Sequence, residues 1–280
     1  MPLTDAQLGA LCLLLEDERP SITAVLDRQL AGFSEEDRDR LLLRLRGEGR
    51  GPAVLPPALE DHHHRALERA FADWAVAAPE EGDLERGVFL LASYGYPLED
   101  MGRWEAELDR MAAGLRLRLG KGAAPAEIVE RTAEYLHGEL RFDGDRDNYY
   151  DPKNSYMNRV LDRRRGIPIS LASVYLMLGR RLDLPFRGVG MPGHFIVKYE
   201  APEGPIFLDP FEGGRRLSVQ DCDAIVRGLG YHFDLRFLQE TPPRRIVERM
   251  LNNLIGICQR EGSEDRIKRL MRYREIVQRG

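Results

Sequence analysis

Two residues whose side chains can do acid–base chemistry stand at the ends of two short apolar runs in the stretch "GMPGHFIVKYEAPEGPIFLDPF" (residues 190–211). His194 comes directly before the run Phe-Ile-Val, and Asp209 comes directly after the run Ile-Phe-Leu. A loop rich in proline and glycine separates the runs, which predicts an antiparallel pair of strands. Because a carboxylate can hold an imidazole in one orientation, the two side chains are candidates for a catalytic or ligand-binding pair.

The helix expected before these strands is the place where a nucleophile would stand. Residues 167–182 form an apolar run bounded by Gly-Ile-Pro on one side and by Asp-Leu-Pro on the other. A helix followed by strands that end in His and Asp has the order of a papain-like site, in which a cysteine opens the helix. In such a site the helix N-terminus lowers the pKa of the thiol, and the histidine pairs with the thiolate.

Three consecutive motifs in this part of the chain resemble one protein family. They read "YYDPKNSYMNRVLDRRRGIPISLASVYLMLGRRLDLP", "MPGHFIVKY" and "FLDPFEGG". Over roughly residues 83–222, about half of the chain, the sequence resembles the bacterial SirB-type proteins of the transglutaminase-like superfamily. The resemblance implies a papain-like core in which His194 and Asp209 match the histidine and the aspartate of the superfamily.

The cysteine of the superfamily has no counterpart in this sequence. When the Asp-Leu-Pro turn that ends the helix fixes the register, Pro168 occupies the place of the cysteine. Proline suits the first helical position, since its missing N–H would be unpaired there, but it supplies no nucleophile. The resemblance therefore implies a pseudoenzyme that has lost cysteine-dependent acyl transfer.

Ser170 is the third catalytic candidate, because its hydroxyl lies close to the expected start of the helix. Two helical positions turn a side chain by about 200°, so Ser170 points largely away from the place of the missing thiol. We expect its hydroxyl to bond to a backbone group at the helix start or to pack in the core. An amide or ester hydrolase that uses Ser170, or a water molecule, with His194 and Asp209 stays an open alternative.

Three further polar residues, Asp151, Asn154 and Asn158, lie just before the helix in the stretch that resembles the family. Their carboxylate and amide groups either line the cleft as ligand-binding residues or cap the next helix. The arginine run at 163–165 either holds an anionic group near the helix N-terminus or forms a solvated face.

Two other patterns suggest metal binding but lack the required spacing. Asp143, Asp145 and Asp147 alternate as in a calcium loop, but the glycine at the sixth position of such a loop and the glutamate at the twelfth are missing. The histidines at 62–64 are consecutive, and a helix separates successive side chains by about 100°, so they cannot share one metal ion. We expect a solvated helix start there, and neither a metal nor a cofactor in the chain.

The composition is that of a globular protein of ordinary charge. The 280 residues are 43% hydrophobic and 31% charged, with a net charge of −5. Acids and bases are interleaved, whereas a nucleic-acid-binding face needs a basic stripe, so no nucleic-acid partner is expected. The apolar stretch near the N-terminus has no basic lead and runs into acids, which predicts neither a signal peptide nor a membrane span. Cys12, Cys222 and Cys258 are scattered, which favours packing roles in a reducing cytoplasm.

Helical periodicity covers most of the chain outside the two strands. We expect four regions: a helical, HEAT-like region at 1–78, a helical lead-in at 79–120, a transglutaminase-like core at 121–235, and a C-terminal, tetratricopeptide-like helical hairpin at 236–280. Ser34 with Asp37 and Ser218 with Asp221 are expected N-caps of two helices. The predicted fold class is α+β, mostly helical, with a papain-like core that contains a small antiparallel sheet.

Three functions are compatible with this reading. The first is binding of a peptide, a protein partner or a small ligand through the ancestral cleft, without thiol chemistry. The second is the hydrolase described above. The third is an interaction scaffold in which only the helical repeats matter. An open cleft with His194 exposed favours the first two functions, and a filled, apolar cleft mouth favours the third.

Overall fold

The computed structural model describes residues 2–17, 19–48, 54–77, 83–120 and 122–279. In these ranges the fold is α+β and mostly helical with a small antiparallel sheet, as the sequence predicts. The helices are α1 (Asp5–Leu15), α2 (Pro20–Ala31), α3 (Glu35–Glu48), α4 (Pro57–Ala77), α5 (Leu84–Gly95), α6 (Gly102–Leu119), α7 (Pro125–Ala133), α8 (Met157–Arg163), α9 (Pro168–Leu182), α10 (Val219–Gly228), α11 (Pro243–Glu261) and α12 (Glu264–Arg279). The strands are β1 (Asp143–Gly144), β2 (Arg165–Gly166), β3 (Phe186–Met191), β4 (His194–Ala201), β5 (Gly204–Asp209) and β6 (Arg215–Leu217).

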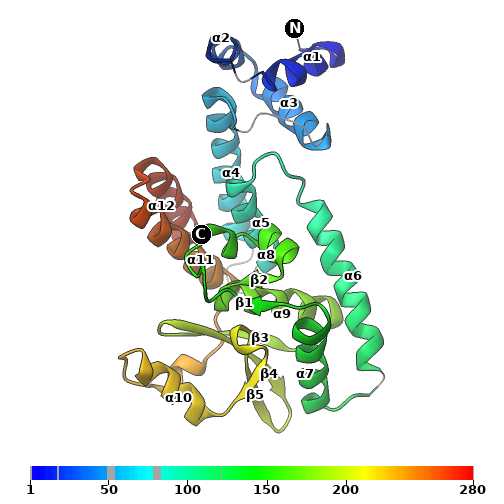
Figure 1. Cartoon of the computed structure of the whole chain (residues 1–280), viewed down its shortest axis with the longest axis vertical. Coiled ribbons are helices and arrows are strands. Elements are labelled where there is room, and N and C mark those ends of the chain that lie inside the picture. The colour runs from blue at the N-terminus through cyan, green and yellow to red at the C-terminus, as the bar shows by residue number, and fades with distance from the viewer. Residues whose placement is uncertain (1, 18, 49–53, 78–82, 121, 280) are drawn as a thin grey trace.

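The N-terminal helices and the sheet lie at opposite ends of the molecule. Figure 1 shows α1, α2 and α3 at one end of the molecule and the sheet with α10 at the other. None of the described helices combines the length and the apolar composition that crossing a membrane would need.

The helices α1, α2 and α3 form a unit with an apolar core of its own. The Ser34 hydroxyl caps α3, because it accepts a hydrogen bond from the backbone N–H of Asp37 at 3.1 Å and donates one to the Asp37 carboxylate at 2.9 Å. This confirms the predicted cap. The same carboxylate accepts a hydrogen bond from the N–H of Leu3 at 2.9 Å and so joins the first residues to α3. The core of the unit consists mainly of leucines: Leu8, Leu11, Leu15, Leu26, Leu30, Leu41, Leu42 and Leu45.

The helix α4 connects this unit to the rest of the molecule (Figure 1). Leu59, in its first turn, lies in the N-terminal core, whereas Phe71 and Trp74 lie in the large core. One helix therefore contributes apolar side chains to two separate cores.

The prediction of a solvated helix start at residues 62–64 is wrong. His62 and His63 are only 0% and 2% exposed. The Nε2 atom of His62 lies 2.7 Å from Oδ1 of Asp39 on α3. The physical reason for the error is that other helices enclose this part of α4 on several sides, and the local sequence does not contain that information.

The other two histidines of the run contact two further helices. His63 Nε2 donates a hydrogen bond to the carbonyl oxygen of Ser93 on α5 at 3.0 Å. His64 Nδ1 lies 2.7 Å from the Tyr273 hydroxyl on α12. Because successive side chains diverge by about 100° on a helix, three consecutive histidines join α4 to three different helices.

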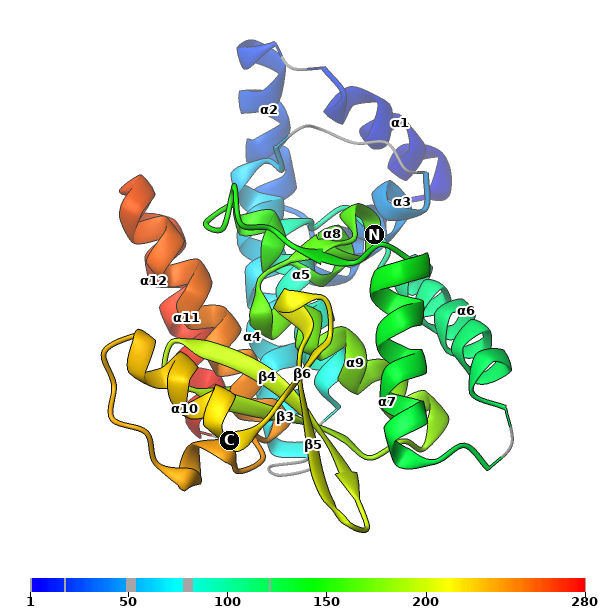
Figure 2. The same ribbon diagram turned by 60° about the horizontal axis from the view of Figure 1, so that its bottom comes forward.

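The sheet has four antiparallel strands in the order β3-β4-β5-β6 (Figure 2). In the register of β4 and β5, Val197 lies opposite Leu208, which confirms the predicted strand pair. The strands β3 and β6 extend this pair at both edges. Gly188 and Gly190 interrupt the apolar pattern of β3, so the sequence alone does not identify it, and pairing with β4 makes it a strand.

Alternate residues of β4 face two different helical layers. Phe195 and Val197 lie in the large core, which includes the apolar face of α9. Ile196 lies in a smaller core together with Cys222 and Val226 of α10. The sheet is therefore covered by α9 on one face and by α10 on the other.

The helices α11 and α12 form the predicted C-terminal pair. Between them Gly262 adopts φ 69°, a left-handed conformation that favours glycine at the end of a helix. The ring centroid of Tyr273 lies 5.1 Å from that of Phe71 on α4 and 5.7 Å from that of Tyr94 on α5. These aromatic contacts hold the pair against the middle of the molecule.

Burial of His63 predicts how the free energy of unfolding varies with pH. Burial lowers the pKa of His63 to about 4 from its ordinary 6.5. The unfolded chain therefore binds more protons than the folded one between these values, and stability falls as the pH falls through this window. The shift corresponds to about 3 kcal/mol in all.

We expect His63→Gln to remove this pH-dependent component in urea unfolding measured between pH 7 and pH 4. His232→Gln, in an exposed loop, is the control and should leave the pH profile of the wild type unchanged. Equal profiles for wild type and His63→Gln would contradict the assignment.

Candidate functional site

The centre of the candidate site is a hydrogen bond between His194, the first residue of β4, and Asp209, the last residue of β5. His194 Nε2 lies 2.8 Å from Asp209 Oδ2, which confirms the predicted pairing. The other carboxylate oxygen of Asp209 accepts hydrogen bonds from the backbone N–H of Phe211 at 3.0 Å and of Glu212 at 3.4 Å. The Asp209 side chain is 2% exposed, so protein donors replace the water that it has lost.

The contact with Asp209 determines which nitrogen of His194 is available. A carboxylate only accepts hydrogen bonds, so Nε2 carries the proton and the neutral ring presents Nδ1 as an acceptor. Within the described residues, Nδ1 has no hydrogen-bond partner, and the side chain is 13% exposed. His194 can therefore accept a hydrogen bond from a ligand or a water through Nδ1.

Phe211 contacts both His194 and the β1 strand that pairs with the segment before α9. Its ring meets the His194 ring edge-on, with centroids 6.5 Å apart. It also packs on the backbone of Gly144, which lies opposite Gly166 in the parallel β1–β2 pair. Gly166 is two residues before Pro168, so these contacts connect the His194 ring to the first turn of α9.

Pro168 is the first residue of α9, as predicted, and Ile167 before it has an extended backbone. Ser170 is fully buried, and its hydroxyl makes both of its hydrogen bonds with Ile167. It accepts from the N–H and donates to the carbonyl oxygen, each at 3.0 Å. The expectation that this hydroxyl bonds to the helix start is confirmed. Within the described residues, no hydrogen bond joins it to His194.

A second histidine near Asp209 was not among the sequence candidates. His137 lies in the π-helical turn Glu134–Glu139 that follows α7. Its Nδ1 donates to the Phe142 carbonyl oxygen at 2.8 Å, so its Nε2 accepts from the Tyr175 hydroxyl at 2.9 Å. Burial lowers the pKa of His137, and burial together with the charge of Asp209 raises the pKa of Tyr175. At neutral pH both side chains of this pair are therefore uncharged.

Gly214 makes room for the His137–Tyr175 pair. Its φ is +75°, and a Cβ atom there would lie 2.7 Å from the Tyr175 hydroxyl oxygen and 3.1 Å from a ring carbon of His137. One signal of this arrangement is present in the sequence, because Tyr175 follows Pro168 by seven positions and so shares its helix face. The π-helical turn that aims His137 at Tyr175 has no such signal.

Asp151, Asn154 and Asn158 are all engaged by neighbouring protein groups. The Asp151 carboxylate accepts from the N–H of Lys153 at 2.9 Å and so caps the short 3-10 helix Pro152–Asn154. The Asn154 side chain donates to the carbonyl oxygen of Asn148 at 2.8 Å. Capping is therefore observed for Asp151 alone, and a ligand-binding role for the three residues stays a prediction.

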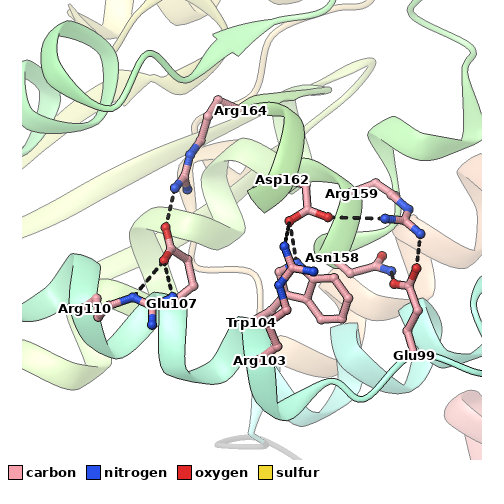
Figure 3. A network of polar contacts seen from close by, with 9 residues as sticks. All are labelled: Glu99, Arg103, Trp104, Glu107, Arg110, Asn158, Arg159, Asp162 and Arg164. Carbon is pink, nitrogen blue, oxygen red and sulfur yellow. Dashed lines mark hydrogen bonds and ion pairs between the residues drawn. The ribbon is translucent and has the colours of Figure 1, made fainter. Parts of the chain in front are cut away.

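Asn158 belongs to a polar network that joins α8 to α6 and to the loop before it (Figure 3). Its side chain donates to the Glu99 carboxylate at 2.8 Å, and Arg159 forms an ion pair with the same carboxylate. Arg159 also forms an ion pair with Asp162 at 3.3 Å. The Asp162 carboxylate accepts a hydrogen bond from the indole N–H of Trp104 at 2.9 Å. These bonds position α8, from which the chain runs through β2 into α9.

The arginine run at 163–165 is divided among several partners and does not form one anion site. Arg163 lies 3.1 Å from the buried carboxylate of Asp145 and 3.4 Å from that of Asp151. Arg164 forms an ion pair with Glu107 (Figure 3). The described residues contain no group of three or more His, Cys, Asp or Glu side chains that could hold a metal ion.

A cavity of about 840 Å³ lies at the other end of α9. Its lining includes Leu176, Phe186 and Ile246. Phe186 pairs with Tyr199 at one end of the β3–β4 ladder, whereas His194 is at the opposite end of the same ladder. This cavity is therefore separate from the His194 site.

The comparisons with known proteins agree with the geometry of the site. Residues 102–252, more than half of the chain, match a family described as the transglutaminase-like superfamily, and this range includes His194 and Asp209. A UPF0162 protein of Xylella fastidiosa (strain 9a5c) is 40% identical over 141 residues, which are 48% of this chain and 50% of that protein. F-box only protein 21 of Homo sapiens is 32% identical over 145 residues, which are 49% of this chain and 23% of that protein.

These similarities cover only part of each protein. A UPF0162 protein of Vibrio cholerae is 43% identical over 108 residues, which are 38% of this chain and 40% of that protein. The chain thus spans about half the length, or less, of these curated relatives. No solved structure matches the chain.

The hydrogen bonds at the site predict unequal costs for removing its two members. Asp209→Ala leaves two backbone N–H groups and an imidazole N–H without their acceptor, so we expect a loss of about 2–4 kcal/mol in the free energy of unfolding. His194→Ala removes one partly exposed hydrogen-bonded ring and should cost about 1 kcal/mol.

Chemical denaturation at pH 7 measures both costs. Asp223→Ala, which removes an exposed i,i+4 pair with Arg227, is the matched control and should cost less than about 0.5 kcal/mol. Equal losses for the Asp209 and His194 variants would contradict the central role of the carboxylate.

Proposed function

Because the chain belongs to the transglutaminase-like superfamily, we propose that it uses the cleft of that superfamily for binding and lacks its thiol chemistry. The observation that carries the proposal is an oriented His194–Asp209 pair beside a helix that opens with Pro168. Proline provides no nucleophile, while the imidazole still offers a free acceptor.

Other side chains do not replace the missing thiol. Cys12, Cys222 and Cys258 are all buried as free thiols. Burial raises the pKa of Cys222 to about 11, so its thiolate, the reactive form, is scarce at neutral pH. The Ser170 hydroxyl is already bonded in both directions to Ile167. The three free cysteines also support the proposal that the protein works in a reducing cytoplasm.

The side chains around His194 suit a ligand with both polar and apolar parts. Nδ1 of His194 can accept a hydrogen bond from an N–H or an O–H group. The Phe211 ring beside it, and the Tyr149 ring whose centroid is 6.0 Å from that of Phe211, provide an aromatic surface. We therefore favour a peptide, a protein segment or a small molecule that presents a hydrogen-bond donor next to an apolar group.

The free Nδ1 also supports a second candidate function. An imidazole oriented by a carboxylate can take a proton from a water molecule, and that water would then attack an amide or an ester. This alternative needs neither Ser170 nor a cysteine, and the binding experiment below distinguishes it.

We expect the imidazole signals of His194 in nitrogen-15 NMR to shift when a panel of N-acetylated dipeptide amides is added. The signals of His232, in an exposed loop, are the internal control and should not move. In parallel, we expect no labelling by a fluorophosphonate probe and no hydrolysis of peptides or simple esters above that of His194→Ala.

Each contrary outcome identifies a different function. A covalent adduct at Ser170 that His194→Ala abolishes would indicate a serine hydrolase. Hydrolysis that depends on His194 without an adduct would indicate the water mechanism. The absence of any shift across the panel would contradict binding at this cleft and favour the scaffold.

Replacing Pro168 by cysteine tests whether the start of α9 still supports a thiolate. We expect Pro168→Cys to fold with a loss of about 1 kcal/mol or less, since only chain stiffness changes. The helix N-terminus should favour the thiolate, so iodoacetamide labelling should have a pH midpoint below about 8. Pro168 and Ile169 are both buried. Ile169→Cys, whose side chain belongs to the large core, is the control and should label more slowly than Pro168→Cys. A midpoint at the free-thiol value would show that the cleft no longer supports this chemistry.

A further inference from the structure

Arg249 on α11 holds the turn that carries His194. Its Nη1 donates to the carbonyl oxygen of Met191 at 3.2 Å, and its Nη2 donates to the carbonyl oxygens of Met191 and His194, each at 3.1 Å. These two carbonyl groups lie on either side of the Pro-Gly turn between β3 and β4. The guanidinium is therefore fixed to the backbone of the candidate site.

The charge of Arg249 has no negative partner nearby. Within the described residues, no carboxylate lies within 4.0 Å of its guanidinium. The phenol of Tyr149 is uncharged at neutral pH, because burial raises its pKa. A half-buried cation without a counter-charge is costly, and burial accordingly lowers the pKa of Arg249.

Two further residues contact the Arg249 guanidinium. Its guanidinium lies over the Phe195 ring, 5.3 Å from the centroid. A Cβ atom at Gly190 would lie 2.7 Å from Nη1, so this position of the arginine requires glycine. The cation is thus placed in the site by its packing, and its direction is set by two carbonyl groups.

Arg249 contacts the backbone of His194. The Phe211 ring contacts the rings of both His194 and Tyr149. Each of the three residues Arg249, Tyr149 and His194 has one polar group without a hydrogen-bond partner within the described residues. These groups are Nε of Arg249, the hydroxyl of Tyr149 and Nδ1 of His194. The first two donate, and the third accepts. Donors beside a positive charge fit a carboxylate, and the acceptor on His194 fits a neighbouring N–H group.

We propose that the ligand of the His194 site carries a carboxylate next to an N–H donor, as an N-acylated amino acid or the C-terminus of a peptide does. The carboxylate binds at Arg249 and the Tyr149 hydroxyl, the N–H donates to Nδ1 of His194, and an apolar side chain packs on Phe211. This inference rests on the proposed binding function and adds the chemical class of the ligand. A phosphate group offers related acceptor chemistry and is therefore included in the test.

The test compares N-acetylphenylalanine with N-acetylphenylalaninamide, which differ only in the carboxylate. Binding is followed through the His194 imidazole signals. In wild type we expect the acid to bind at least about tenfold more tightly than the amide. Arg249→Gln should bring this ratio close to one, and Arg249→Lys, which keeps the charge, should retain part of it. Arg245→Gln makes the same change in net charge on the same helix and should leave the ratio unchanged.

Two further measurements separate recognition from folding. Tyr149→Phe removes one hydroxyl and should weaken binding of the acid more than binding of the amide. Thermal unfolding and the Nε2–H signal of His194 report whether each variant keeps the fold and the bond to Asp209. If Arg249→Gln disturbs the fold or the bond to Asp209, the acid-to-amide affinity ratio is compared in Arg249→Lys and Tyr149→Phe instead. A lower ratio in both variants supports the carboxylate site, and an unchanged ratio contradicts it.

The outcomes distinguish this inference from the proposed function. If the acid and the amide shift His194 equally in wild type, the cleft binds ligands but the carboxylate assignment is wrong. If the ratio persists in Arg249→Gln with its fold intact, Arg249 is not the anion site. Phenyl phosphate, which lacks the N–H donor, should bind more weakly than N-acetylphenylalanine, and tighter binding would overturn the assignment to a peptide C-terminus.

Discussion

The hydrogen bonds of the Asp209 carboxylate determine the geometry of the site. One oxygen orients the His194 ring, and the other receives two backbone N–H groups of the turn after β5. A single buried side chain therefore ends a strand, forms the next turn and fixes an imidazole. The same turn places the Phe211 ring beside His194, so this aromatic contact also depends on the carboxylate. The His137–Tyr175 pair, which is uncharged at neutral pH, adds no second charge that could compete for these bonds.

The sequence predicts those parts of the structure that depend on one local pattern. The alternation of apolar residues on either side of a Pro- and Gly-rich turn predicted the strand pair, and this pairing brings His194 and Asp209 together. The position of Pro168 and the bonds of Ser170 also followed from helix geometry alone. The edge strand β3 did not follow, because its glycines make room for Arg249 and for the Phe195 ring and leave no strand pattern.

The features that the sequence missed all depend on contacts between distant segments. The histidines at 62–64 resemble an exposed polar run, yet α3, α5 and α12 bury or contact them. His137 reaches Tyr175 only because the helix after α7 widens into a π-helical turn. Asn158 precedes the central helix like a capping residue, but its amide donates to Glu99 across the α6–α8 network. In each case the residue type indicates a polar contact, but the sequence does not identify the residue at the other end of that contact.

The site has a positive charge, that of Arg249, without a negative charge beside it in the described part of the chain, and Pro168 stands where a thiolate could have supplied one. In a thiol-dependent site, a thiolate at the start of the helix contributes a negative charge beside the histidine. Pro168 contributes none, and the Asp209 carboxylate is buried against His194 and backbone N–H groups. Arg249 remains as a cation fixed by carbonyl groups of the turn that carries His194. A ligand carboxylate would supply the missing negative charge without moving that turn, because the Nη bonds of Arg249 already hold it. A helix that begins with Pro168 is therefore compatible with the proposed recognition of an anionic ligand at the same site.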